Sequence, residues 1–396
     1  MALVSSRLFL AAALVIAAAA ARAQSCPEPA TWSALDGERP RAAQASALLD
    51  RMAQREVVLL GEVHDDADHH YWQLQTLAAL HARRPDMAIG FEMFPRRVQP
   101  VLDRWVAGEL TVKEFLEQSE WHANWNMPAE LYLPLFEFAR INRIPMLALN
   151  IERKLSRAIT EKGWDAVPDA EREGLGRPAP PAEAYRDGLF EVYLQHPTLR
   201  EKGDKGGKGA KPKQSDAAFR FFVESQTAWD RAMAEALVRR AGAGKPLVVG
   251  VMGSGHLRHG HGVPHQLRDL GVKNIGTLLP LSADAECKDL RAGLADAVFM
   301  LPAQVAPKPA PPRLGIQLED RPGGVRILAV TAGSLAEQTG LKRGDVILEM
   351  AGRPVKKVLV AIGLVRLQPA GTWLPLRIKR GEETLELVVR FPPEKS

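Results

Sequence analysis

Two short stretches of this sequence end alike, Val57-Val-Leu-Leu-Gly-Glu-Val-His64 and Val248-Val-Gly-Val-Met-Gly-Ser-Gly-His256. Each begins as an apolar run and closes on Gly-x-x-His. Continuous apolar runs of this length predict strands buried on both faces of a sheet. Glycine lets the backbone turn sharply where a strand stops, so each histidine should lie at the carboxyl edge of the sheet, where open α/β sheets place their ligands.

Three further apolar runs predict strands of the same sheet, at residues 87–91, 145–149 and 274–279. Helix-like stretches, among them residues 68–83 and 217–240, separate them. This alternation predicts an α/β fold, a mostly parallel sheet covered by helices on both faces. From about residue 313 to 392 short strands and turn residues follow one another around a single helical stretch, which predicts a small β-rich domain.

Irregular segments divide the chain into predicted domains. Residues 1–23 resemble a secretory leader, with Arg7, an apolar run too short to span a bilayer and a small-residue cleavage site. Residues 24–301 form the large domain, which a lysine- and glycine-rich loop at 202–214 interrupts. The proline-rich stretch 302–312 predicts an extended linker that holds the two folded units apart.

Composition narrows the classes of function. The 396 residues are 46% hydrophobic and 25% charged, with only two cysteines, which excludes a disulfide-dense scaffold and a Cys-rich metal module. The 202–214 loop contributes +4 to the formal charge of +5, and two arginines of the leader contribute +2. The remainder is nearly neutral, so nucleic acid is not an expected partner.

The leader predicts export across the inner membrane to a periplasmic or envelope location, which is an oxidising compartment. There Cys26 and Cys287 can form a disulfide that ties the N-terminal arm to the end of the large domain, and two free thiols are the alternative. Cys26 also lies just beyond the apolar run, so membrane attachment is expected only if this cysteine is lipidated.

The candidate chemistry lies at the predicted strand ends. His64 and His256 with the carboxylates Glu62 and Glu92 could bind a metal or carry out acid–base chemistry, unless the histidines only hydrogen-bond the strand-end backbone. The aromatic cluster from Trp121 to Tyr132 suits either a core corner or a planar ligand.

Residues 45–300 resemble the ChaN-type haem-binding uptake family, part of the wider group that includes the Tiki and TraB proteins. The resemblance is carried by an ordered set of motifs: Leu60-Gly-Glu-Val-His-Asp65, Phe91-Glu-Met-Phe94, Tyr132-Leu-Pro134, Trp229-Asp230 and Gly253-Ser-Gly-His256 with Gly260-His-Gly-Val-Pro264.

This resemblance implies haem binding at the cell envelope, in some members by a homodimer that stacks two haems, with a tyrosine as iron ligand. Many relatives carry tyrosine after the second Gly-x-x-His, where this chain has His259. The expected cofactor-binding residues are His64, Glu92, His256, His259 and Tyr132. His259 can take the place of the family tyrosine, because haem iron accepts imidazole as readily as phenolate.

The C-terminal domain resembles a PDZ domain of the bacterial HtrA type, through Leu314-Gly-Ile-Gln-Leu318 and Gly340-Leu-Lys-Arg-Gly-Asp345 followed by apolar residues. The resemblance implies that a peptide C-terminus adds as a strand beside Leu314, Gly315, Ile316 and Gln317. The alternative is a domain used only for packing.

The sequence thus predicts a non-enzymatic envelope protein for haem-iron uptake or handling, with a PDZ module that binds a peptide partner. A Tiki-like metal-dependent hydrolase is the alternative, in which His64 and His256 hold a divalent metal and Glu62 or Glu92 acts as general base.

Overall fold

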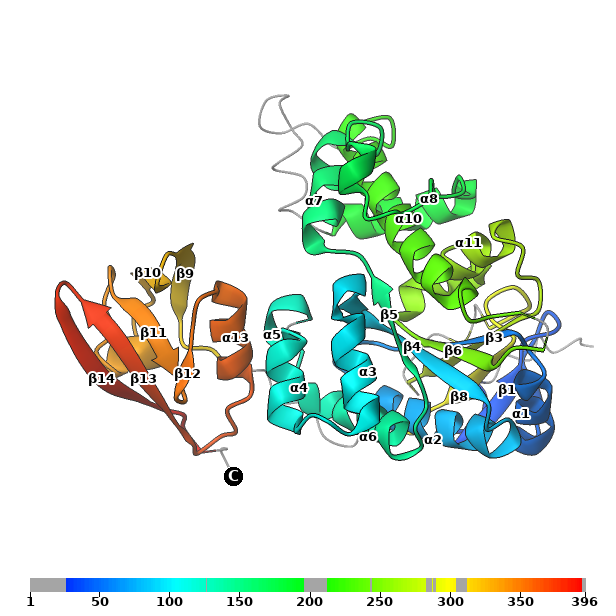
Figure 1. Cartoon of the computed structure of the whole chain (residues 1–396), viewed down its shortest axis with the longest axis horizontal. Coiled ribbons are helices and arrows are strands. Elements are labelled where there is room, and N and C mark those ends of the chain that lie inside the picture. The colour runs from blue at the N-terminus through cyan, green and yellow to red at the C-terminus, as the bar shows by residue number, and fades with distance from the viewer. Residues whose placement is uncertain are drawn as a thin grey trace, which may run out of the picture.

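The computed structural model describes residues 26–125, 127–195, 212–242, 244–282, 287, 290–303 and 312–393. An eight-stranded sheet forms the centre of the large domain, in the order β2-β1-β8-β7-β3-β6-β4-β5 (Figure 1). Six of its strands run parallel, namely β3 (Val57–Leu60), β4 (Met87–Pro95), β5 (Met146–Asn150), β6 (Leu247–Val251), β7 (Ile275–Leu281) and β8 (Ala297–Met300). The predicted parallel α/β sheet is therefore confirmed, with an antiparallel edge that the sequence analysis did not predict.

The central strand β3 is buried on both faces, because its side chains alternate between two hydrophobic cores. Val58 and Leu60 of β3 pack in the core on one face, and Val57 and Leu59 pack in the core on the other. Helices cover both faces (Figure 1). The first core takes residues from α1 (Ala45–Ala53), α2 (Ala67–Arg83), α3 (Gln99–Ala107), α4 (Val112–Gln118), α5 (Trp121–Asn124) and α6 (Leu133–Ile141), and the second from α10 (Ala217–Val238) and α11 (Val263–Asp269).

Two more helices extend the molecule beyond the second face. α7 (Arg153–Lys162) follows β5 and packs on α10, and α8 (Glu183–Leu194) packs further along α10. Each fills a small apolar cluster with α10, around Ile159 and Trp164 for α7 and around Tyr193 and Phe219 for α8. These helices project past the carboxyl edge of the sheet, where they can form a wall of a site.

The antiparallel edge is closed by the N-terminal arm. β1 (Thr31–Ala34) pairs with β8 and with β2 (Arg41–Ala43). The predicted disulfide is present, since Cys26 is bonded to Cys287. A sulfur held in a disulfide cannot carry a thioether-linked lipid, so lipidation of Cys26 does not fit this structure. Within the described residues, none of the helices has the length and apolar character of a membrane-crossing segment.

The C-terminal domain is a separate antiparallel sheet in the order β14-β13-β11-β10-β9, with β12 paired to β11. Its elements are β9 (Ile316–Arg321), β10 (Gly324–Val330), α12 (Leu335–Gln338), β11 (Val346–Met350), β12 (Arg353–Pro354), α13 (Val358–Arg366), β13 (Trp373–Arg380) and β14 (Glu383–Arg390). The predicted β-rich domain is confirmed. Most of the predicted linker lies outside the described residues, and α13 contacts α5 of the large domain, so the units are not held apart as the linker predicted.

Candidate functional site

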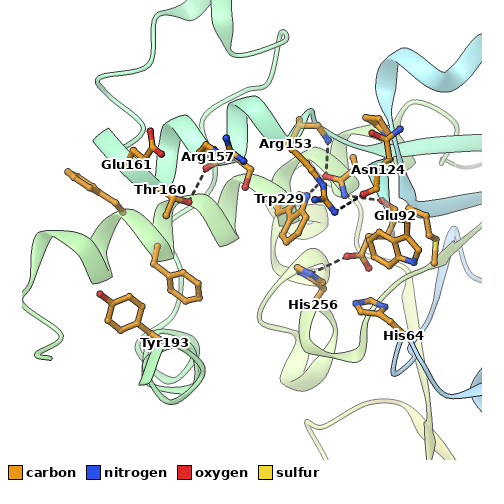
Figure 2. A pocket seen from close by; sticks show the side chains of 18 of the residues that line it. His64, Glu92, Asn124, Arg153, Arg157, Thr160, Glu161, Tyr193, Trp229 and His256 are labelled. Atoms are coloured by element: carbon orange, nitrogen blue, oxygen red, sulfur yellow. Dashed lines mark hydrogen bonds and ion pairs between the residues drawn. The ribbon is translucent and has the colours of Figure 1, made fainter. Parts of the chain in front are cut away.

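The carboxyl ends of three neighbouring strands bring the predicted residues together. His64 follows β3, Glu92 lies in the last part of β4, and His256 ends the 3-10 helix η4 (Ser254–His256) that follows β6. All three line one cavity, whose volume is about 1120 Å³. Figure 2 shows them at one end of it. The expectation that both Gly-x-x-His units deliver their histidines to this edge agrees with the structure.

A buried carboxylate holds the His64 ring from behind. Glu62 Oε1 lies 2.7 Å from His64 Nδ1 and accepts a hydrogen bond of 2.8 Å from the Tyr132 hydroxyl. Glu62 Oε2 accepts a hydrogen bond of 3.1 Å from Gln73. Because Nδ1 is engaged by the carboxylate, Nε2 is the nitrogen left to face a ligand. The Trp125 ring packs edge-on against His64 at 4.8 Å and fixes its orientation further.

His256 has the same kind of support from different elements. Its Nδ1 lies 2.6 Å from Asp230 Oδ1, and the Tyr185 hydroxyl donates a hydrogen bond of 2.8 Å to Asp230 Oδ2. Asp230 is on α10 and Tyr185 on α8, and Trp229 packs perpendicular to the histidine ring. The site is therefore two similar units, each a tyrosine hydroxyl, a buried carboxylate and a histidine in series.

Glu92 lies between the two histidines. Its Oε2 accepts a hydrogen bond of 2.7 Å from the Gly253 amide, and its Oε1 is 3.6 Å from His256 Nε2. A Cβ at Gly253 would lie 3.1 Å from His64 Nε2 and 3.7 Å from Glu92 Oε2, so Glu92 and His64 approach the same glycine. Only a residue without a side chain fits between them.

These contacts set the charges of the site. Burial would lower the pKa of His256, but the carboxylates of Glu92 and Asp230 outweigh it and raise that pKa to about 9. Burial opposes protonation of His64 as well, and its hydrogen bond to Glu62 and the charge of Glu92 nevertheless raise its pKa. The pKa of Glu62 is lowered despite burial, because His64 and His70 stabilise the carboxylate. At neutral pH His256 is an imidazolium.

The rest of the cavity is aromatic with one polar wall (Figure 2). Trp125, Trp229, Tyr193, Phe221 and Phe222 supply the aromatic surface. The polar wall is α7, whose residues Arg153, Ser156, Arg157, Thr160 and Glu161 all line the cavity. Their spacing places them on one face of the helix, while Leu155 and Ile159 are buried on the opposite face. The cavity thus combines flat apolar walls with charged groups, as suits a large amphiphilic ligand.

Two predicted cofactor-binding residues lie elsewhere. Tyr132 is fully buried behind His64, so it positions Glu62 and does not face the cavity. His259 is exposed and absent from the cavity lining. The backbone turns at His259 with φ of 59°, and its amide donates to the Leu294 carbonyl, which directs this segment away from the cavity. Position after a motif does not specify side-chain direction, so the sequence could not show which of these side chains face the cavity.

Sequence reasoning did not assign the cavity residues of α7, α8 and the start of α10. The polar face of α7 was readable from the i, i+3, i+4, i+7 spacing of its Arg, Ser and Thr residues opposite two apolar positions. Tyr193 had no such signal, because a single tyrosine in a helix is equally typical of a core. The aromatic cluster is divided between the two expected roles. Trp121 is buried in the core, whereas Trp125 lines the cavity.

A second, smaller cavity of about 300 Å³ lies in the C-terminal domain, between the edge strand β9 and α13. Of the predicted peptide-binding residues, Leu314, Gly315 and Ile316 line it, whereas Gln317 does not and is exposed. Successive residues of a strand point to opposite faces, which explains the difference. The remaining lining residues are Pro312, Arg313, Leu318, Met350, Ala361, Ile362, Val365 and Arg366.

The hydrolase alternative places a metal between His64 and His256. Among the residues that the structure describes, no group of three or more His, Cys, Asp or Glu side chains is arranged to hold a metal ion. Glu62 is excluded as a base acting on a ligand, because it is buried and directed at the far side of the His64 ring. Glu92 is the carboxylate that reaches the cavity beside the two histidines.

Comparison with known proteins finds a matching family for each of the two domains. A family profile described as haem-binding uptake, Tiki superfamily, ChaN matches residues 48–267, and a PDZ domain profile matches residues 312–390. The solved structure "Cofacial heme binding to ChaN of Campylobacter jejuni" is 19% identical, with a TM-score of 0.50, over 68% of this chain and 96% of that one. At this identity the likeness shows the fold.

The C-terminal domain has its own relatives. A putative serine protease HhoB of Synechocystis is 39% identical over 70 residues, which are 18% of this chain and 17% of that protein. A solved HtrA3 PDZ domain bound to a phage-derived ligand is 22% identical, covers 20% of this chain and 82% of that one, and has a TM-score of 0.18. The chain spans about a sixth of the curated relative.

Proposed function

Because the chain belongs to the haem-binding uptake family of the Tiki superfamily, the ChaN family, we propose that it binds haem in the cavity beside His64, Glu92 and His256. The observation that carries the proposal is the pair of carboxylate-backed histidines at the end of a large aromatic cavity. Histidines that bind metals in proteins commonly have their second ring nitrogen engaged by a carboxylate, which orients the ring and makes it a better donor.

The residues present fit a haem by shape and by chemistry. The cavity of about 1120 Å³ exceeds the size usual for drug-sized ligands, and its tryptophan and phenylalanine walls suit a flat apolar ring. When bound, haem supplies an iron that accepts an imidazole nitrogen. His64 and His256 are the imidazoles that line the cavity among the described residues.

The two histidines take different roles in this proposal. Two carboxylates face His256 and keep its proton, and a protonated nitrogen cannot donate to iron. The His64 side chain is 34% exposed, compared with 11% for His256, so its Nε2 is the accessible donor. We therefore assign His64 as the iron ligand and His256, with Glu92, as the charged end of the cavity that donates hydrogen bonds and positions the ligand.

The PDZ domain serves a second binding function in this proposal. β9 is an edge strand, and the groove between β9 and α13 is apolar, so a peptide C-terminus can extend the sheet there. Together with the predicted leader, whose residues lie outside the described part of the chain, this favours an envelope protein that handles haem and docks on a peptide partner.

The metal-dependent hydrolase is the competing proposal, and Glu92 between two histidines is the observation in its favour. Elemental analysis of the purified protein beside its visible spectrum separates the two. One equivalent of zinc or manganese with no affinity for haem would replace the haem proposal by the hydrolase.

Titration of the mature protein with hemin tests the assignment directly. The wild type should give a saturable Soret shift, and His64→Gln should weaken binding by about tenfold or more through loss of the iron ligand. His256→Gln should weaken binding while the ligation spectrum is kept. His259→Gln is the matched control, because this histidine lies outside the cavity, and it should titrate as the wild type does. Spectra that are simple sums of protein and free hemin would refute haem binding.

A further inference from the structure

The polar wall of the cavity contains two arginines whose role the proposed function does not explain. Arg153 and Arg157 lie one turn apart on α7, and both line the cavity. With a rise of about 1.5 Å per residue, side chains at i and i+4 lie on the same face about 6 Å apart along the axis. The face opposite holds Leu155 and Ile159 against α10, so the arginine face is fixed toward the cavity.

Two neighbouring carboxylates are engaged with other partners, whereas Glu161, one turn beyond Arg157, lines the same cavity (Figure 2) and is in none of the ion pairs of the described residues. Glu152 pairs with Arg97 at 2.6 Å, and Glu173 accepts the Glu152 amide. Within the described residues no ion pair joins Arg153 or Arg157 to a carboxylate, whereas Arg96 and Arg231 each pair with Glu235. Arg153 instead donates a hydrogen bond of 3.0 Å to the Asn124 carbonyl, which holds its guanidinium at the cavity edge.

The two positive charges also act on each other. Burial lowers the pKa of Arg153 below its usual value, and the charge of Arg157 lowers it further. Glu161 puts one negative charge on the same wall, so the arginine pair leaves a net positive charge there. Two like charges side by side, neither of them in an ion pair with a carboxylate, repel each other in the empty protein. An anionic group placed between them removes this repulsion and accepts paired hydrogen bonds from each guanidinium.

We infer that Arg153 and Arg157 form a carboxylate-binding subsite, which takes the acidic side chains of a flat amphiphilic ligand whose ring lies against the aromatic walls. This inference rests on the proposed function, for which haem, with its two propionate groups, is such a ligand. The subsite gives the cavity a preferred orientation of the ligand, with the carboxylates at α7 and the ring centre left for the histidine end.

The test compares iron protoporphyrin IX with its dimethyl ester, in which both carboxylates are blocked, under the same detergent conditions on the full mature chain. The wild type should bind the free acid about tenfold or more tightly than the ester, since hydrogen bonds between charged partners are among the stronger ones. Arg153→Gln with Arg157→Gln should remove this preference by weakening binding of the acid, and leave the ester within twofold of wild type.

Lys154→Gln is the matched control, because Lys154 is a neighbouring exposed cation on α7 that does not line the cavity. It should change neither affinity, and the Soret maximum of the saturated arginine variant should match that of the wild type because iron ligation is separate. If acid and ester bind the wild type equally, or if the arginine variant weakens both alike, the carboxylate subsite is wrong while haem binding stands. If neither porphyrin binds the wild type, the proposed function itself fails.

Discussion

At the scale of single residues, the site depends on how two histidines are held. In each, Nδ1 lies within hydrogen-bonding distance of a buried carboxylate, Glu62 for His64 and Asp230 for His256. Each carboxylate also accepts a hydrogen bond from a buried tyrosine hydroxyl. Buried carboxylates are costly unless paired and hydrogen-bonded, and here both conditions are met. Glu92 acts on both rings: its charge raises the pKa of His64 and that of His256, and its Oε1 lies 3.6 Å from His256 Nε2.

The raised pKa of His256 predicts how the free energy of unfolding depends on pH. Its folded value of about 9 lies above the unfolded value of 6.5, so the folded state holds the proton more tightly. The stabilisation is fully present below pH 6.5 and is lost as the pH rises through about 9. We expect the free energy of unfolding to fall by roughly 3 kcal/mol across that window from this group.

Urea unfolding of the haem-free protein at intervals from pH 6 to pH 10 measures this loss, and His256→Gln should flatten the profile. An NMR titration of the His256 ring in the wild type checks the same group without a variant. A ring that titrates near 6.5 in the folded protein would contradict the charge arrangement described for the site.

The sequence predicted that His64, Glu92 and His256 lie at the carboxyl edge of the sheet, because the end of a strand can be recognised from local sequence. It could not predict Asp230 or Tyr185 as their support, since those residues come from α10 and α8 and meet the site only through tertiary packing. It grouped His259 and Tyr132 with these residues because each is close to a motif in sequence, although neither lines the cavity in the fold.

At the scale of elements, the turns after β3 and β6 determine the geometry. Gly253 follows β6, and its amide binds Glu92 while the space above it is taken by the His64 ring. A Cβ at Gly253 would come within 2.9 Å of His64 Cε1, closer than carbon atoms normally approach. The end of one strand therefore positions residues from two others.

This crowding predicts that Gly253→Ala displaces His64 and weakens hemin binding by about tenfold, an effect of about 1.4 kcal/mol. Gly255→Ala is the matched control, because a Cβ there would meet nothing within 4 Å. Hemin titration and thermal unfolding of both variants measure the effect. Equal affinities for Gly253→Ala and Gly255→Ala would show that the approach of His64 to this turn does not matter for binding.

Most elements were predictable at this scale. The expected strands at 57–60, 87–91 and 247–252 are present with small changes at their ends, because long apolar runs override weaker local preferences. The edge strands β1 and β2 were not predicted, since they are short and owe their form to pairing with β8 and to the disulfide. The role of α7 as a cavity wall depends on its packing against α10, which no local pattern specifies.

At the scale of the whole molecule, the two binding functions are assigned to different parts of the chain. Every residue that lines the large cavity lies between His64 and His256, and every residue that lines the groove lies between Pro312 and Arg366. The parts nevertheless touch, since α13 forms one wall of the groove and contacts α5, which ends next to Trp125 in the large cavity.

Truncation before residue 312 tests this division. We expect the shortened protein to bind hemin within about threefold of the full chain, because no lining residue is lost, and to lose binding of peptides with a free C-terminal carboxylate. Fluorescence anisotropy with a free and a C-terminally amidated peptide measures the second effect. A truncated protein that stays folded but no longer binds hemin would show that the PDZ domain completes the haem site.

We propose that haem occupies the cavity between α7, α10 and the strand ends. A crystal structure of the full mature chain with bound hemin tests it most directly. We expect porphyrin density against Trp125 and Trp229, with iron bound to His64 Nε2 and the propionates at Arg153 and Arg157. Porphyrin density outside this cavity, or a single metal ion held by His64, Glu92 and His256 in its place, would contradict it.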